Sequence, residues 1–248
     1  MKLQTMKKNL FCWMTIMLMA FVCAGFAACG GSDDDGNGSG GNSNGGGNSN
    51  GATNTGSHEA VDLGLPSGTK WASMNVGANA PEECGNYYAW GDVVTRENYD
   101  HTTISYGYTE SGGDYSKYNA TDGKTVLEPM DDAATVNWGG SWRTPTRVEM
   151  EELINLCTWE VTTQNGVIGC KVTGPNGKSI FMPAAGRYNK TSLGNKDRYL
   201  YYWTATLWIS SSGKTLNGAE LKVNMEKNNP DIDDDHRDVG MPVRPVTK

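Results

Sequence analysis

Histidine is scarce in this sequence, and the common catalytic motifs that depend on it are missing. The 248 residues contain three histidines, His58, His101 and His236, and each is isolated along the chain. There is no His-Glu zinc motif, no Ser-His-acid spacing and no glycine-rich loop of the kind that cradles phosphate. We therefore expect that the protein is not an enzyme.

Cysteine is also sparse beyond the N-terminal region. Cys84, Cys157 and Cys170 are the three cysteines that follow residue 29. An odd number outside the cytoplasm leaves at least one thiol unpaired or paired with another chain. Cys157 and Cys170 can close a small loop, but the sequence leaves that pairing open, and no metal-type pair spacing occurs.

Lysine and arginine are also few relative to aspartate and glutamate. The chain has 21 Lys and Arg against 28 Asp and Glu, a formal net charge of −7. Such a chain is repelled by nucleic acid and by anionic lipid head groups. Nucleic acid is therefore excluded as a partner.

A long uncharged apolar run occurs at the N-terminus. Residues 10–28 carry no charge, three lysines precede them, and the run ends in Ala27-Ala28-Cys29. This pattern resembles a bacterial lipobox, where a signal peptidase cuts and the new N-terminal cysteine is acylated. We predict a signal peptide at 1–28 and a membrane anchor through lipidated Cys29. A transmembrane helix is the alternative, and Cys23, preceded by branched Val22, is a second candidate for the acylated cysteine.

Residues 29–57 are predicted to form a lipidated cysteine followed by a disordered linker. Gly, Asn and Ser dominate this segment, which lacks the apolar residues needed to offset the entropy of ordering. Asp33, Asp34 and Asp35 resemble the acidic tag that sends lipoproteins of Bacteroides-type bacteria to the outer face of the outer membrane; the alternative is simple solubilising charge. We expect an outer-membrane protein that faces the extracellular side.

Residues 58–248 are predicted to form one domain of ordinary size. Thr146 and Glu149 have the spacing of a helix capping box, and Met150, Leu153 and Cys157 follow along one helical face. An Asn-Gly turn joins two further strands. The other expected elements are strands at 61–65, 69–76, 169–173, 179–182, 219–223 and 241–246, a shorter helix near 131–136, and a long surface excursion at 98–125.

Several motifs together carry a family resemblance. The longest is Trp138-Gly139-Gly140-Ser141-Trp142-Arg143-Thr144-Pro145-Thr146, and the others lie at 61–72, 87–91, 131–134, 179–186, 202–206 and 240–246. Over residues 60–246 the chain resembles the Fibrobacter succinogenes major paralogous domain, which is abundant in surface lipoproteins of gut Bacteroides. The resemblance implies an α+β, C-type-lectin-like domain with small antiparallel sheets, about two helices and long loops.

The same resemblance bears on the roles of individual residues. The C-type-lectin-like fold also occurs in the formylglycine-generating enzymes, which use reactive cysteines near the end of the chain. The last cysteine here is Cys170, so no cysteine lies in the closing loops. We expect the motif residues to be structural, with Arg143 and Arg244 each holding a carboxylate. Possible carboxylate partners are Asp131, Asp132 and Glu149.

Lectin-like folds bind ligands through the long loops before the final strands, which here correspond to about 188–238. Aromatic rings stack on sugars or on protein surfaces, and asparagine both donates and accepts hydrogen bonds. The candidate ligand contacts are Tyr188, Tyr201, Tyr202, Trp208, Asn217, Asn228 and Asn229. The alternative is that Tyr201 and Trp203 point inward on a strand while Tyr202 points out.

An acidic run at 231–235 is the sharpest local feature, and we expect it to be a loop. Its carboxylates, Asp231, Asp233, Asp234 and Asp235, can gather around calcium, which takes six to eight oxygen ligands. The run lacks the EF-hand spacing and the Glu-Pro-Asn signature of calcium-dependent lectins. No cofactor is expected, with calcium as the one open alternative to a solvated acidic loop.

These observations together predict a non-catalytic module at the cell surface that binds a glycan or a protein ligand. The alternative is a structural or accessory subunit of a cell-surface assembly or fimbria.

Overall fold

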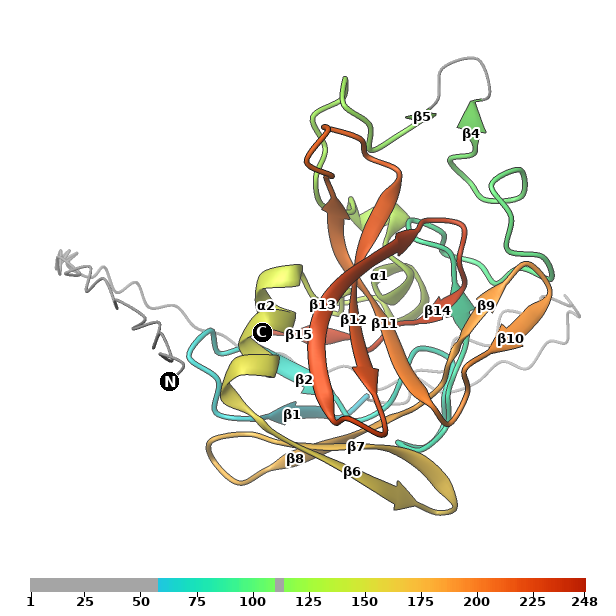
Figure 1. Ribbon diagram of the computed structural model, residues 1–248. Coiled ribbons are helices and arrows are strands. Elements are labelled where there is room, and N and C mark those ends of the chain that lie inside the picture. Colours follow the sequence, from blue (N-terminus) through green and yellow to red (C-terminus); the bar gives the residue numbers. More distant parts are fainter. Residues whose placement is uncertain (1–57, 110–113) are drawn as a thin grey trace, which may run out of the picture. The chain divides into compact units, whose positions relative to one another are not determined.

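The computed structural model describes residues 58–109 and 114–248. The predicted signal peptide, Cys29 and the linker lie outside these ranges. Small antiparallel sheets predominate in the described residues, together with two α-helices, α1 (Ala133–Trp138) and α2 (Arg147–Leu156) (Figure 1). No helix in this part of the chain is both long and apolar enough to cross a membrane. The architecture is a sheet-rich α+β fold.

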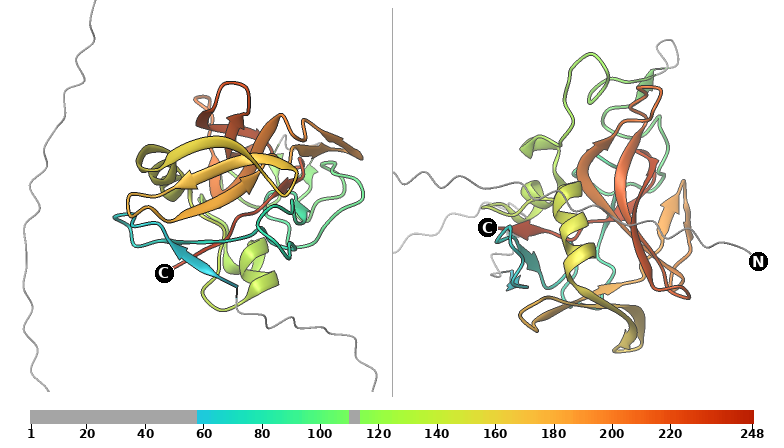
Figure 2. Two further views of the ribbon diagram at one scale, coloured as in Figure 1. Left: turned by 90° about the horizontal axis from the view of Figure 1, so that it is seen from below. Right: turned by 60° about the vertical axis from the view of Figure 1, so that its left-hand side comes forward.

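The longest strands form a three-stranded antiparallel sheet in the order β11 (Tyr199–Trp208), β12 (Asn217–Asn224) and β13 (Asn229–His236). Helix α2 packs against this sheet (Figure 2). The register of β11 shifts between Trp203 and Leu207, which marks an irregularity such as a β-bulge.

A second three-stranded sheet confirms the predicted hairpin. It contains β6 (Thr158–Gln164), β7 (Val167–Thr173) and β8 (Ser179–Pro183) in that order. The turn between β7 and β8 ends at Gly177, whose φ of 82° suits glycine because that conformation crowds a Cβ atom.

The two ends of the domain meet in a third sheet. Strand β2 (Lys70–Ala72) lies between β1 (Ala60–Asp62) and β15 (Val246–Thr247), so residues near both ends of the domain are hydrogen-bonded to one strand. A short 3₁₀ helix, η1 (Pro129–Asp131), precedes α1. The remaining strands form pairs: β3 (Tyr87–Tyr88) with β14 (Met241–Pro242), β4 (Tyr108–Thr109) with β5 (Asp114–Tyr115), and β9 (Arg187–Asn189) with β10 (Ser192–Gly194).

Helix α2 begins as its sequence predicts. The Thr146 hydroxyl accepts a hydrogen bond from the Glu149 backbone N–H, and the Glu149 carboxylate accepts one from the Thr146 N–H, which completes the capping box. Met150 and Leu153 are fully buried and pack in one core cluster with Trp71 and residues of β7, β8, β11 and β12.

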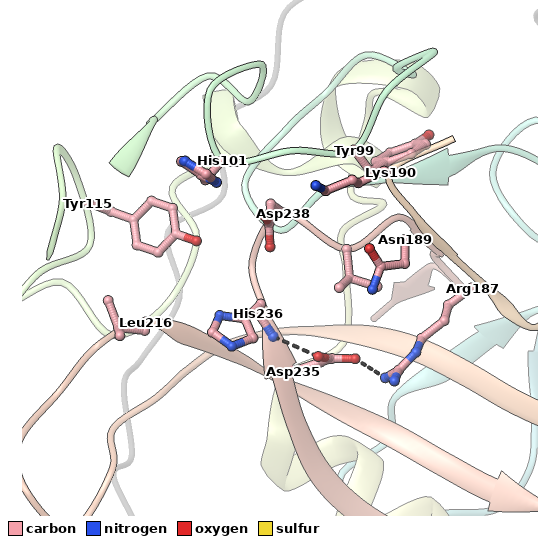
Figure 3. A pocket seen from close by; sticks show the side chains of 11 residues that line it. Tyr99, His101, Tyr115, Arg187, Asn189, Lys190, Leu216, Asp235, His236 and Asp238 are labelled. Carbon is pink, nitrogen blue, oxygen red and sulfur yellow. Dashed lines mark hydrogen bonds and ion pairs between the residues drawn. The ribbon is translucent and has the colours of Figure 1, made fainter. Parts of the chain in front are cut away.

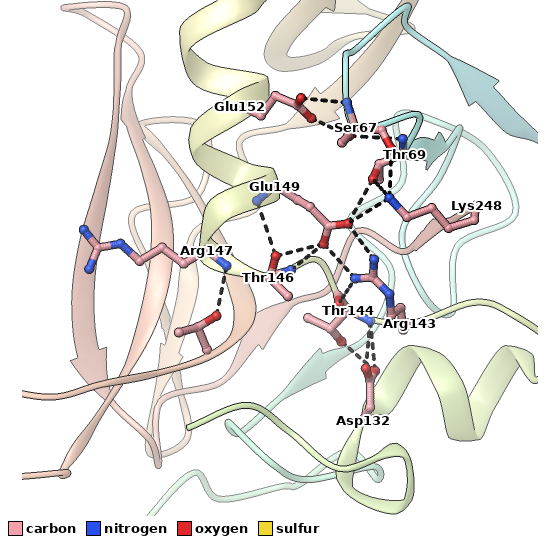
Figure 4. A network of polar contacts seen from close by, with 11 residues as sticks. Ser67, Thr69, Asp132, Arg143, Thr144, Thr146, Arg147, Glu149, Glu152 and Lys248 are labelled. Atoms are coloured by element: carbon pink, nitrogen blue, oxygen red, sulfur yellow. Dashed lines mark hydrogen bonds and ion pairs between the residues drawn. The ribbon is translucent and has the colours of Figure 1, made fainter. Parts of the chain in front are cut away.

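The Trp-Arg-x-Pro-Thr motif forms a polar network around Glu149 (Figure 4). Arg143 donates two hydrogen bonds to the Glu149 carboxylate, at 2.5 and 2.7 Å. Burial opposes ionisation of Glu149, but hydrogen bonds from Arg143 and Thr146 outweigh it and lower its pKa to about 2. Asp132 caps α1 and also accepts from the backbone N–H and hydroxyl of Thr144. The contacts of Arg143, Thr144 and Thr146 thus give this motif the structural role that was predicted for it.

Arg244 differs from its prediction. Its guanidinium is fully buried and reaches no carboxylate of the described residues; it donates to three backbone carbonyls and to the side chain of Asn75. The three carbonyls belong to Ala72, Ser73 and Phe181. Because no acidic residue shares its site, Arg244 joins segments of backbone instead of forming an ion pair.

The described part of the predicted surface excursion, residues 98–109 and 114–125, is mostly irregular but is anchored to the core. Tyr99, Tyr115 and Tyr118 are buried in it. The buried carboxylate of Asp131 accepts hydrogen bonds from Tyr118 and Lys117, at 2.5 Å each. A carboxylate of the motif region therefore holds the excursion in place.

Candidate functional site

The acidic run at 231–235 lies in strand β13, so the prediction of a loop is wrong. Strand geometry alternates side chains between two faces, and this separates Asp234 from Asp231, Asp233 and Asp235. Asp234 accepts a hydrogen bond from Asn217, whereas Asp233 pairs with Lys222 at 2.6 Å. No group of three or more His, Cys, Asp and Glu side chains in the described residues is placed to hold a metal ion.

Tyr202 and Tyr201 are core residues, which corrects their assignment to a ligand-binding surface. Tyr202 is 0% exposed; its hydroxyl accepts from Asn75 and donates to the Pro183 carbonyl. Tyr201 is 3% exposed. The alternative is right that Tyr201 and Trp203 point inward but wrong that Tyr202 points outward. Strand β11 is covered on both faces: Leu200 and Tyr202 belong to one core cluster, and Tyr201 and Trp203 to another.

The other predicted contacts do not gather at one place. Trp208 lies under the guanidinium of Arg147, at 4.8 Å from its ring centroid. Asn217 pairs with Asp234 near this end of the sheet. Asn228 is exposed with a φ of 46°, and its side chain donates to the Trp159 carbonyl, which fixes the turn before β13.

Three predicted residues do meet in a shallow cavity of about 220 Å³ beside β12 and β13. They are Asn229, Asp231 and Asp233, and the cavity also contains lysine side chains and the ring of a tyrosine. Its remaining lining residues are Tyr199, Lys222, Asn224 and Lys227.

A larger pocket of about 400 Å³ lies at the other end of β13 (Figure 3). It is formed by strand β9 and the residue that follows it, by the end of β13 with the turn after it, and by residues of the excursion. The lining residues are Tyr99, His101, Tyr115, Arg187, Asn189, Lys190, Leu216, Asp235, His236, Asp238 and Val239.

Asp235 is the one predicted site residue that lines this pocket directly. Tyr188 contacts the pocket residue Tyr99, because the two rings stack with a centroid distance of 5.5 Å. His101 and His236 are isolated residues in the sequence, yet the fold places both at this pocket. No local sequence signal joins them, because 134 other residues separate them in the chain.

Arg187 and Asp235 form the polar centre of the pocket. Figure 3 shows Asp235 between Arg187 and His236, joined to both. One carboxylate oxygen of Asp235 pairs with Arg187, and the other accepts the backbone N–H of His236 at 2.9 Å. The guanidinium also lies 4.7 Å from the ring centroid of Tyr201. These contacts fix the orientation of Arg187 while leaving its side chain 31% exposed.

Glu220 is a buried carboxyl group on β12, close enough to Arg187 to be influenced by its charge. It is 1% exposed, and neither carboxyl oxygen has a hydrogen-bond partner in the described residues. Burial raises the pKa of Glu220 to about 8, against the opposing charge of Arg187. A carboxyl group with a pKa of about 8 is mostly protonated at pH 7, so Glu220 adds little negative charge beside Arg187.

The cysteines lie away from this pocket. Cys84, Cys157 and Cys170 are all free, so the open Cys157–Cys170 pairing is not formed. Burial raises the pKa of Cys157 to about 11 and that of Cys170 to about 12. Thiols with such pKa values carry little thiolate at neutral pH and are poor nucleophiles.

The fold and the pocket together define a sheet-rich α+β domain with a polar, tyrosine-walled surface cavity. Comparison of the chain with models of known protein families, with curated proteins and with solved structures finds no match. The resemblance drawn from the motifs therefore stays a prediction.

Proposed function

We propose that this chain is a lipid-anchored protein of the bacterial outer membrane, and that its domain at 58–248 binds a glycan at the cell surface without catalysis. The observation that carries the proposal is the pocket in which Arg187, Asp235 and His236 meet beside tyrosine rings. The motif resemblance to the major paralogous domain, with its C-type-lectin-like fold, supports the same function.

The chemistry of the pocket suits a sugar. Each sugar hydroxyl both donates and accepts hydrogen bonds, and the pocket offers acceptors on Asp235 and Asp238 and donors on Arg187 and Lys190. Tyr99 adds aromatic surface of the kind that contacts the apolar face of a sugar ring. The volume of about 400 Å³ lies within the range of about 300–1,000 Å³ that is typical of small-molecule sites.

A glycan array tests the proposal, with residues 29–248 carrying C29S as the soluble probe. We expect binding to one class of glycan, and we expect Arg187→Ala to weaken that binding at least tenfold in calorimetric titration. Arg187 holds Asp235 in place, so its loss removes a donor and releases an acceptor.

The matched control is Arg198→Ala. Arg198 is exposed and lies outside the lining of both cavities, so its loss changes the net charge equally without altering the site. An array without signal, or equal binding by the two variants, would contradict the proposal and favour a protein ligand or a structural role.

A further inference from the structure

Strand β13 is an edge strand, so another strand could join the sheet along its outer side unless that side is blocked. In the described residues the sheet order is β11-β12-β13, and no further strand pairs with β13. An edge strand usually presents a row of unpaired N–H and C=O groups, which another chain can use as a template for pairing.

Alternate backbone N–H groups of β13 are already occupied by side chains of the same strand. Ile232, Asp234 and His236 each donate their backbone N–H to the carboxylate of the aspartate that precedes them. The acceptors are Asp231 at 2.8 Å, Asp233 at 3.0 Å and Asp235 at 2.9 Å.

These N–H groups belong to the outward edge of the strand. Backbone N–H groups alternate between the two edges, so those of residues 232, 234 and 236 share an edge with position 230. That position is Pro230, which has no N–H and is confined to the solvent side of edge strands. The ladder to β12 therefore uses the other series, and the outward edge offers no free N–H from 230 to 236.

The two carboxylate oxygens of Asp233 and of Asp235 make different contacts. In Asp233 and Asp235, Oδ1 accepts the backbone N–H of the next residue, while Oδ2 pairs with Lys222 and Arg187 respectively. The ion pairs with Lys222 of β12 and Arg187 of β9 hold the carboxylates in the orientation that caps the edge.

We infer that the aspartates of β13 close the edge of the sheet to strand addition and keep a second copy of this chain from pairing there. The one-residue spacing of Asp231, Asp233 and Asp235 follows from this role, because it matches the period of a strand. A second copy would also place a row of carboxylates opposite this one, which is unfavourable. Two copies of the chain therefore cannot associate by pairing strands along this edge.

The test compares oligomeric states by size-exclusion chromatography with light scattering, using residues 29–248 carrying C29S. The triple variant D231V/D233V/D235V removes every cap, and we expect it to form dimers or larger species in a concentration-dependent manner. The triple variant D231N/D233N/D235N keeps an oxygen acceptor at each position, and we expect it to stay monomeric.

Two further measurements keep the test decisive. Asp234→Val is the control, since the Asp234 carboxylate caps no N–H of the edge; it should stay monomeric. In case the triple valine variant does not fold, amide hydrogen exchange is followed in D231V, D233V and D235V singly. The N–H after each substitution should exchange at least tenfold faster than in the parent chain.

A folded triple valine variant that stays monomeric, or an asparagine variant that associates equally strongly, would overturn the inference. Unchanged exchange of the N–H groups of Ile232, Asp234 and His236 in the single variants would overturn it as well.

Discussion

Arg143, Arg237 and Arg244 are three arginines of the domain whose guanidinium groups are satisfied in different ways. Arg143 forms a two-bond ion pair with Glu149, and Arg244 donates to backbone carbonyls and one asparagine. Arg237 is 1% exposed; it donates to backbone carbonyls and lies 5.0 Å from the ring centroid of Trp90. A guanidinium has five fixed donors, so it can join several backbone segments without any carboxylate.

Glu220 gives a prediction about pH at the same scale. The pKa of Glu220 is about 8 in the folded state and near 4.5 in an unfolded chain. Because folding raises this pKa, the stability it contributes is fully present below pH 4.5 and is lost as the pH rises through about 8. Glu220→Gln removes the ionisable group. The free energy of unfolding of this variant, measured relative to that of the parent chain, should therefore be about 2–4 kcal/mol higher at pH 8 than at pH 4.

Urea unfolding at pH 4 and pH 8 measures this difference. Glu160→Gln serves as the control, because Glu160 is an exposed residue of β6; a surface substitution of this kind should change the free energy of unfolding by no more than about 0.5 kcal/mol. Parallel pH profiles for Glu220→Gln and the parent chain would show that Glu220 ionises normally in the folded state.

At the scale of elements, β11 and β13 show how the setting of a strand decides the role of its residues. β11 is central to the core and buries Tyr201, Tyr202 and Trp203 in succession. β13 is the end strand on the other side of the same sheet, but it is only partly buried, and its residues carry the charges that cap its outer edge and hold Arg187.

Gly218 on β12 provides a prediction about how the sheet meets the core. A Cβ atom at this position would lie 2.5 Å from the ring of Trp90, which is 3% exposed and donates its indole N–H to the Thr204 carbonyl. Gly218→Ala must displace that ring, and we expect a loss of about 2–3 kcal/mol in the free energy of unfolding. Tryptophan fluorescence should report a changed environment.

The control for this substitution is Gly194→Ala. Gly194 also lies in a strand, and a Cβ atom there meets nothing within 4 Å; the change in the free energy of unfolding should stay within about 0.5 kcal/mol. If the two variants are equally stable, Trp90 is not fixed against the sheet as described.

At the scale of the whole molecule, the domain closes on itself. Strand β2 pairs with β1 near the start and with β15 at the end, and Arg143 pairs by backbone hydrogen bonds with Val246. The segment around the Trp-Arg motif and the chain end are thereby held at the same sheet. Substitutions in either segment should affect the stability of the whole domain.

The lipid anchor is a prediction about the whole molecule. In a bacterium that processes lipoproteins, Cys29→Ser should abolish labelling with radioactive palmitate and move the protein from the membrane fraction to the soluble fraction, because it removes the thiol that we predict to be acylated. Cys23→Ser is the matched control and should keep both the label and the membrane fraction. Retention of the label in Cys29→Ser, or its loss in Cys23→Ser, would contradict the assignment.

The elements with strong local patterns were predictable from the sequence. The capping box of α2, the short helix α1 and the β7–β8 hairpin are set by residues a few positions apart, whose hydrogen bonds and turn conformations are local. The charge of the acidic run predicts a loop in solvent, but a half-exposed edge strand also tolerates alternating charge, and the run forms strand β13.

The pocket was not predictable, because it depends on distant segments. The sequence predicts Asp235 as a calcium ligand and gives no sign of this pocket, whereas His101 and Arg187 reach the pocket because the excursion and β9 pack against the end of β13. By itself the sequence determined the acidic balance, the helix starts and the turns, which depend on composition and on contacts between near neighbours. Only the tertiary structure decided which tyrosines are buried and which charges share a cavity, because burial and proximity arise from packing between residues far apart in the chain.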